Sequence, residues 1–234
     1  MAVWNINVPT SEYYGPLPLN PRGVFSGNIN DLIPEIETAT EIAIDTETTG
    51  LVTFKEQVLY WSLAWNNRRC TLHSSMIPYF FHIFANPKKT WIFANAKFDM
   101  HMLAQMGVHI AGTIHCTQVM HSLLFEEMSH RLKDMAKHLL GWRWSSFEDT
   151  FGKITEQNTP LMVIQKAERE NFPLLVEYAA NDAWGTMGCY RSLRPQLEQA
   201  MTHSLFRECP PYIETLWDLF TKVEAPYTKV LWKN

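Results

Sequence analysis

The sequence predicts one large domain of the α/β class, in which strands come first and helices follow, with alternation in the middle. Two observations support this class. The 234 residues are 46% hydrophobic and 19% charged, enough apolar surface for a sizeable core. Short apolar runs bounded by polar turns fill the N-terminal half, whereas stretches with helical spacing fill the C-terminal half. No internal repeat or low-complexity tract interrupts this order.

The first half of the chain reads as a lead-in, a helix and a set of strands. Residues 1–27 are rich in Pro, Gly and Asn and predict an extended lead-in that lies on the domain. Residues 29–40 have helical spacing behind an Asn cap. The following runs predict strands over 41–47, 58–65, 68–73 and 91–94, with a tight turn at Asn66-Asn67 and a short helix over 76–84.

The second half predicts helices. The run over 131–140 is the clearest, because its apolar residues recur at i, i+3, i+4, i+7 and i+8 and Gly141 follows as a stop. Residues 142–160 predict an irregular segment. Further helices are predicted over 98–106, 117–126, 160–169, 173–193 and 211–222.

Charge and cysteine usage exclude several classes. The net charge of −4 and the pI of about 6.1 argue against a basic protein that coats nucleic acid without sequence preference. The four cysteines are far apart, with no C-x-x-C pair, and no signal peptide or membrane-length apolar run is visible. These features predict free thiols, an intracellular location and no membrane partner.

The segment 42–50, Ile-Ala-Ile-Asp-Thr-Glu-Thr-Thr-Gly, contains the first candidate site. In a strand, Asp45 and Glu47 point to the same face. Two carboxylates so close repel each other unless a cation neutralises them, and oxygen ligands suit Mg²⁺ or Mn²⁺. The sequence therefore predicts a metal site at the end of this strand.

Two more segments have acidic residues in comparable places. Asn95 and Asp99 follow the buried strand that ends at Ala94, where ligands gather in open α/β sheets. Tyr178 and Asp182 are i, i+4 on a helix and share one face. Taken singly, the first pair is most simply a helix cap with a first-turn acid, and the second a surface pair. Their occurrence together, in this order, favours a joint site.

The three segments, D-x-E, N-x-x-x-D and Y-x-x-x-D, resemble the three motifs of the DEDD superfamily of 3′→5′ exonucleases. The tyrosine type is indicated, because Glu177 stands where the other branch has a histidine. Over roughly residues 38–230 the chain resembles the proofreading domain of family A DNA polymerases. This resemblance implies a ribonuclease H-like fold, with a central mixed sheet flanked by helices. It places the exonuclease domain at 28–210 and, at 211–234, a helix leading toward a polymerase domain outside these 234 residues.

The resemblance also implies a reaction. The family hydrolyses DNA from the 3′ end and releases 5′-mononucleotides, using two divalent ions, Mg or Mn, about 4 Å apart. Asp45 would bridge the ions, with Glu47 and Asp182 on the nucleophile-side ion and Asp99 on the other. Tyr178 and Glu47 would orient the attacking water.

Substrate contacts are implied in the same way. Leu51 would wedge against the terminal base, Asn95 would lie near the terminal nucleotide, and Thr48 would offer its amide or hydroxyl to the 3′ end. The expected partners are a single-stranded DNA 3′ end and a polymerase domain or chain, in a cytoplasmic or viral-replication context. The alternatives are a ribonuclease D-like 3′-exoribonuclease and a catalytically silent domain that binds 3′ ends.

Several residues remain open. Cys116 stands where many relatives have an Asp, which puts local hydrogen bonding in doubt. Zinc sites built from His115, Cys116 and His121, or from Cys189, His203 and Cys209, fit no zinc spacing and are disfavoured. The candidates for stacking on substrate bases are the aromatic residues Trp142, Trp144 and Phe151. The basic residues of the same region face either DNA phosphates or solvent: His130, Arg131, Lys133, Lys137 and Arg143.

Overall fold

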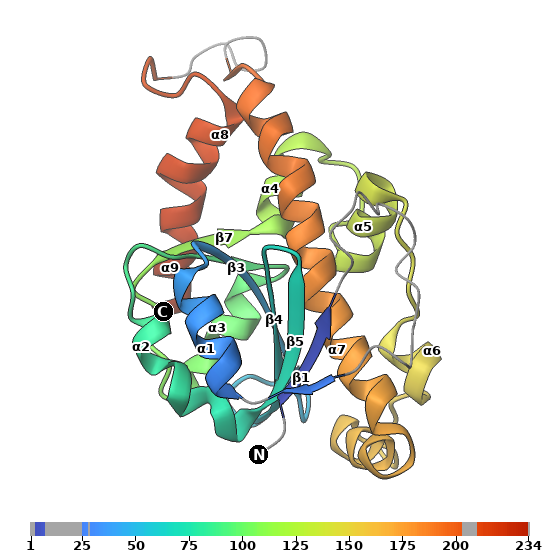
Figure 1. The fold of residues 1–234 in the computed structure, drawn as a ribbon. Coiled ribbons are helices and arrows are strands. Elements are labelled where there is room, and N and C mark those ends of the chain that lie inside the picture. The colour runs from blue at the N-terminus through green and yellow to red at the C-terminus, as the bar shows by residue number, and fades with distance from the viewer. Residues whose placement is uncertain (1–2, 8–24, 28, 203–209, 234) are drawn as a thin grey trace.

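The computed structural model describes residues 3–7, 25–27, 29–202 and 210–233. Within these residues, seven strands form one mixed sheet in the order β2-β1-β5-β4-β3-β6-β7. The sheet confirms the predicted class (Figure 1). The strands are β1 Val3–Asn7, β2 Phe25–Gly27, β3 Glu41–Thr48, β4 Val58–Trp65, β5 Arg68–His73, β6 Thr90–Phe93 and β7 Thr113–Cys116.

The central strand β3 is antiparallel to β4 and parallel to β6, which is itself parallel to β7. The carboxyl ends of β3 and β6 therefore lie at the same edge of the sheet. Along β3, Ile42 and Ile44 are buried in one core and Ala43 in another. This period-2 alternation places Asp45 and Glu47 on the face of Ala43.

Helices cover both faces of the sheet. The long helix α7 packs across β3, β4 and β5, together with α4, α5 and α8, whereas α1, α2 and α3 pack on the opposite face (Figure 1). The helical segments are α1 Ile29–Thr38, a 3₁₀ helix Ser74–Phe80, α2 Phe81–Phe84, α3 Ala96–Gln105, α4 Thr117–Leu124, α5 Leu132–Leu140, α6 Phe147–Phe151, α7 Pro160–Gln199, α8 Leu216–Leu219, a π turn Phe220–Glu224 and α9 Ala225–Lys233.

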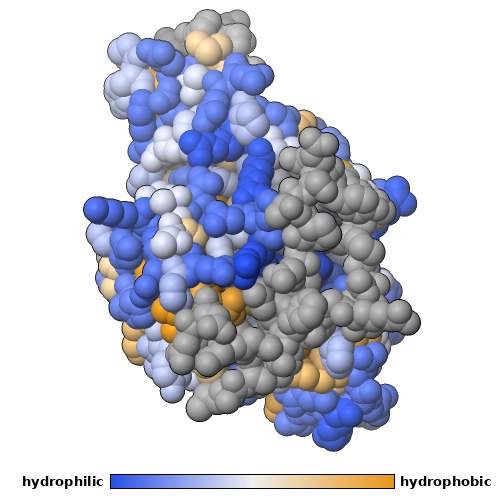
Figure 2. Space-filling model, in the orientation of Figure 1, coloured by the Kyte–Doolittle hydropathy of each residue, from blue (hydrophilic) through white to orange (hydrophobic). Residues whose placement is uncertain are grey.

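The apolar residues are concentrated between these layers. Large side chains such as Trp61, Trp65 and Trp91 are fully buried. The described surface seen in Figure 2 is mainly hydrophilic, with small separate apolar patches. None of the described helices combines the length and the apolarity that a membrane span requires.

Two elements differ from the sequence-based expectation in the middle of the chain. The strand β7 was not predicted, because Thr113–Cys116 contains only four residues and alternates polar with apolar, and its pairing with the distant β6 determines its conformation. The predicted irregular stretch contains α6, which begins at a capping box between Ser146 and Asp149.

The C-terminal helices also differ. The two helices predicted over 160–169 and 173–193 are confirmed as the two parts of α7, which meet at a kink where Asn171 is non-helical (φ −155°, ψ 64°), but the second part continues to Gln199. The helix predicted over 211–222 begins only at Leu216 and reaches Lys233. Pro226 has no N–H to donate, and a π turn precedes it instead of a helix end. The domain boundaries at 27 and 210 remain a prediction, since residues 8–24 and 203–209 lie outside the described part.

Candidate active site

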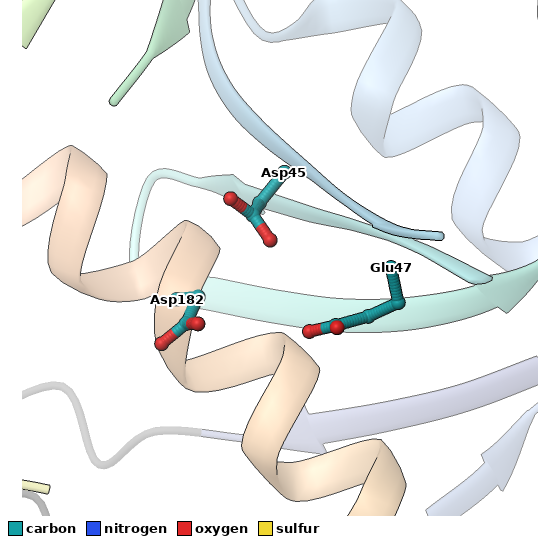
Figure 3. A group of neighbouring side chains, drawn as sticks. All are labelled: Asp45, Glu47 and Asp182. Atoms are coloured by element: carbon teal, nitrogen blue, oxygen red, sulfur yellow. The ribbon is translucent and has the colours of Figure 1, made fainter. Parts of the chain in front are cut away.

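Three carboxylates from β3 and α7 meet at the carboxyl end of β3 (Figure 3). Oxygen atoms of Asp45, Glu47 and Asp182 all lie within 4.8 Å of one another. All three side chains are half-buried. The helix approaches the strand closely because the residues around Asp182, including Ala179 and Ala183, are small and fully buried.

The pKa values of these carboxylates reflect burial and mutual repulsion. Burial raises the pKa of Asp45 well above its ordinary value, and the charges of Asp99, Asp182 and Glu47 raise it further. Burial and the charge of Asp182 raise the pKa of Glu47 to about 8. Burial likewise raises the pKa of Asp182. The site therefore holds more negative charge than its own surroundings neutralise.

The fourth predicted carboxylate, Asp99, lies close by but outside this group of three. Its Oδ1 accepts hydrogen bonds from the Thr46 amide (3.0 Å) and the Thr46 hydroxyl (2.7 Å). Burial raises the pKa of Asp99 to about 7, while the two Thr46 bonds oppose that shift. Its charge still acts on Asp45. Thr46 thus ties the first turn of α3 to the end of β3.

Tyr178 and Asp182 share one face of α7, as their spacing predicts. The Tyr178 hydroxyl accepts a hydrogen bond from Lys133 Nζ at 2.6 Å, and the same Nζ lies 3.7 Å from Asp182 Oδ1. The indole N–H of Trp144 donates to Asp182 Oδ1 at 2.5 Å. A Cβ at Gly185 would come within 2.5 Å of Trp144, so a glycine here makes room for that indole.

The donor set fits a hard divalent cation. Within the described part of the chain, the Asp45, Glu47 and Asp182 group is the single cluster of three or more His, Cys, Asp or Glu side chains whose ligand atoms are this close. Carboxylate oxygens are the ligands that Mg²⁺ and Mn²⁺ prefer. A bound cation would favour the charged forms of these buried carboxylates and would relieve the repulsion that adds to the raised pKa values of Asp45 and Glu47. The geometry and chemistry of this acidic cluster therefore fit the binding of a divalent cation.

The disfavoured zinc sites gain no support. Cys116 is buried, and its thiol donates a hydrogen bond to the carbonyl of Ala94 at 3.3 Å. The thiol thus makes a local hydrogen bond at the position where many relatives have an Asp. His115 Nδ1 lies 3.3 Å from Tyr190 Oη, and His121 contacts His130. His203 and Cys209 of the second set lie outside the described residues.

The predicted substrate contacts have different environments. Leu51 is 84% exposed on the loop after β3, and Asn95 is exposed at the start of α3 without a side-chain cap bond. Both are accessible to a ligand. Thr48 is buried, and its hydroxyl donates to the carbonyl of Gly50 at 2.6 Å. That hydroxyl therefore already has an acceptor.

The three aromatic residues considered for base stacking also lie in different environments. Trp142 is buried beside Trp184, with parallel rings 6.4 Å apart, so the expectation that Trp142 stacks on a substrate base is wrong. Trp144 is half-buried against Asp182, and Phe151 packs edge-on against Tyr178 at 5.4 Å. Both belong to the wall of the site.

The sequence-based site omitted Thr46 and gave Lys133 and Trp144 other roles. Lys133 was grouped with a diffuse basic run, although it falls at i, i+3 and i+7 with Ala136 and Leu140 on the inner side of α5. A lysine in line with the apolar residues of a helix points toward the protein interior, and this position could have indicated that Lys133 belongs to the site. The bond from Trp144 to Asp182 spans 38 residues, and no local pattern could predict it.

Comparisons with known proteins agree with this geometry. A family model described as 3′-5′ exonuclease, of the DNA polymerase A type, matches residues 26–198. The chain is 27% identical over 216 residues to DNA polymerase I of Chloroflexus aurantiacus, a match covering 86% of the chain. It is 32% identical over 116 residues to DNA polymerase DpoZ of Salmonella phage PMBT28, covering 47% of the chain. The matches span only about one fifth of either polymerase (20% and 19%).

Solved structures share the fold at low identity. Brucella melitensis NrnC superposes with a TM-score of 0.59 at 18% identity, covering 84% of this chain and 86% of NrnC. The catalytic core of RRP6 from Trypanosoma brucei gives a TM-score of 0.60 at 14% identity, covering 96% of this chain and 58% of that core. These likenesses support the fold of the domain.

Proposed function

Since the chain belongs to the 3′-5′ exonuclease domains of the DNA polymerase A type, we propose that it hydrolyses single-stranded DNA from the 3′ end and releases 5′-mononucleotides. We further propose that it serves a family A-like DNA polymerase in proofreading. The convergence of Asp45, Glu47 and Asp182 within 4.8 Å carries this proposal. It supplies the acidic pocket that phosphodiester hydrolysis with divalent metal requires.

Asp45, Glu47 and Asp182 would hold the metal, with Asp99 contributing to a second ion. Mg²⁺ or Mn²⁺ bound there would lower the pKa of a water molecule and stabilise charge on the leaving 3′-oxygen. A structure of the fold relative NrnC with bound Mg²⁺ supports the choice of ion. Two ions and their identity as Mg or Mn are part of the proposal.

The protein side chains would orient the reactants. Glu47 and the Tyr178 hydroxyl would hold the attacking water in line with the phosphorus, and Leu51 and Asn95 would hold the terminal nucleotide. Burial, followed by the charges of Asp182, Glu47 and Asp45, raises the pKa of Tyr178 far above its usual range. The raised pKa favours the protonated phenol, which would act through hydrogen bonds.

A polymerase context supports DNA as the substrate. Both sequence relatives are DNA polymerases, and their remaining four fifths have no counterpart in this chain. We propose that a polymerase domain or chain delivers the 3′ end to this site. The phage relative supports a role in viral replication.

The test compares end-labelled single strands of DNA and RNA of one sequence, incubated with the protein and Mg²⁺ or Mn²⁺. We expect 5′-labelled DNA to shorten one nucleotide at a time, and 3′-labelled DNA to release its label as a mononucleotide. Strong preference for RNA would instead indicate a 3′-exoribonuclease. Retention of both labels with binding to the 3′ end would indicate a silent end-binding domain.

A further inference from the structure

One ammonium group lies inside the acidic site without belonging to any of the three motifs. Lys133 of α5 donates to Tyr178 Oη at 2.6 Å, and its Nζ lies 3.7 Å from Asp182 Oδ1. Its side chain is 27% exposed. Its charge opposes the raised pKa values of Asp45, Glu47 and Asp182. Lys133 is therefore electrostatically part of the site.

The fold fixes this ammonium group from two sides. Aromatic rings flank it, with Nζ 4.4 Å from the ring centroid of Tyr178 and 5.7 Å from that of Trp144. Buried Met135 and Ala136 anchor α5 in the core, and the helix ends in a left-handed Gly141. A lysine held in this way has lost much of its rotamer freedom, which a solvated surface lysine would keep.

The chemistry of the contact determines in which of its hydrogen bonds the Tyr178 hydroxyl accepts and in which it donates. An ammonium group donates and never accepts. The phenolic oxygen must therefore accept from Lys133, while the phenolic proton is donated to the carboxylate of Asp182. An ammonium partner also makes the bond stronger than a bond between neutral groups. The bond accepted from Lys133 and the bond donated to Asp182 together fix the orientation of the Tyr178 hydroxyl.

We propose that Lys133 is a positioning residue for the exonuclease reaction, acting through Tyr178 by holding its hydroxyl against Asp182, beside the place where the attacking water would bind. This inference rests on the proposed function. It differs from two simpler roles, a structural ion pair with Asp182 and a direct contact with the substrate phosphate. Neither of those roles depends on the presence of the Tyr178 hydroxyl.

A double-mutant cycle separates these roles. Lys133→Met removes the ammonium group and keeps the apolar stem, and Tyr178→Phe removes the hydroxyl. A hydrogen bond to a charged group corresponds to roughly 10- to 100-fold in rate, so we expect each single variant to lower kcat by that factor with little change in KM. The double variant should be no slower than the slower single variant. Lys133→Arg should restore part of the activity.

The controls isolate the ammonium group. Lys166→Met makes the same change at an exposed position of α7 away from the site and should retain wild-type kcat. Mn²⁺ affinity, measured by calorimetry, should not fall in Lys133→Met, because a repelling cation has been removed. Multiplying effects in the double variant, an unaffected Lys133→Met enzyme, or loss of Mn²⁺ binding would each overturn the inference. An inactive wild-type protein would instead refute the proposed function itself.

Discussion

Replacing Asp45 by Asn is expected to lower cleavage at least ~10³-fold. Asp45 is the carboxylate on which Asp99, Asp182 and Glu47 all act, so it lies at the centre of the acidic cluster. The metal supplies several kcal/mol of transition-state stabilisation, and each 1.36 kcal/mol corresponds to a factor of ten in rate. The measurement is the initial rate of mononucleotide release from 3′-labelled single-stranded DNA with Mn²⁺ in excess.

The matched control for this variant is Glu170→Gln. Glu170 is an exposed residue of α7 that pairs with Lys166, so the same removal of one charge occurs away from the site. Its rate should equal that of the wild type. The melting temperature of metal-free Asp45→Asn should not fall, because one source of repulsion is gone. Wild-type activity in Asp45→Asn would place the chemistry elsewhere.

Mn²⁺ is expected to raise the melting temperature more at pH 8 than at pH 5. The pKa of Glu47 is raised from its ordinary 4.5 to about 8, and that of Asp99 from 3.8 to about 7. Between the ordinary and raised values the folded protein holds protons that the unfolded chain releases. The metal-free fold therefore loses stability as pH rises from about 4 to 8, and this loss is absent below pH 4.

At high pH the carboxylates of the cluster are deprotonated, and bound Mn²⁺ would neutralise their charge in place of the lost protons. At a concentration 100 times Kd, binding stabilises the fold by about 2.7 kcal/mol, which is roughly 5 to 10 °C for a chain of this size. The measurement is thermal unfolding at pH 5, 6, 7 and 8, with and without Mn²⁺. Glu47→Gln should show a flatter pH dependence and a smaller gain. Equal gains at pH 5 and pH 8 in the wild type would contradict the explanation.

The elements predicted best from the sequence are those that local patterns determine. The strands at 58–65 and 68–73 have the predicted bounds, because a mainly apolar run precedes the Asn66-Asn67 turn and Asn66 adopts the left-handed turn conformation (φ 49°). The strand β7 escaped prediction, because its four residues lack the continuous apolar run that indicates the equally short β6. Its pairing with β6 depends on residues about 20 positions earlier in the chain.

The same division applies to the site. The spacing of Asp45 with Glu47, and of Tyr178 with Asp182, determines which side chains share a face, and both pairs do so in the structure. Local spacing does not determine which helices and strands pack against one another in the tertiary structure. The bond between Lys133 and Tyr178 spans 45 residues, and its geometry depends on how α5 packs against α7. Sequence spacing therefore predicts the acidic residues of the site but not their polar partners.

The most direct test of the central claim is an anomalous-scattering map from crystals grown with Mn²⁺. If the acidic cluster is the catalytic metal site, the map will contain a peak in ligand contact with Asp45, Glu47 and Asp182. A second peak will lie on the side of Asp45 that faces Asp99. Fully bound Mn²⁺ elsewhere on the protein, with no peak at this cluster, would contradict the account.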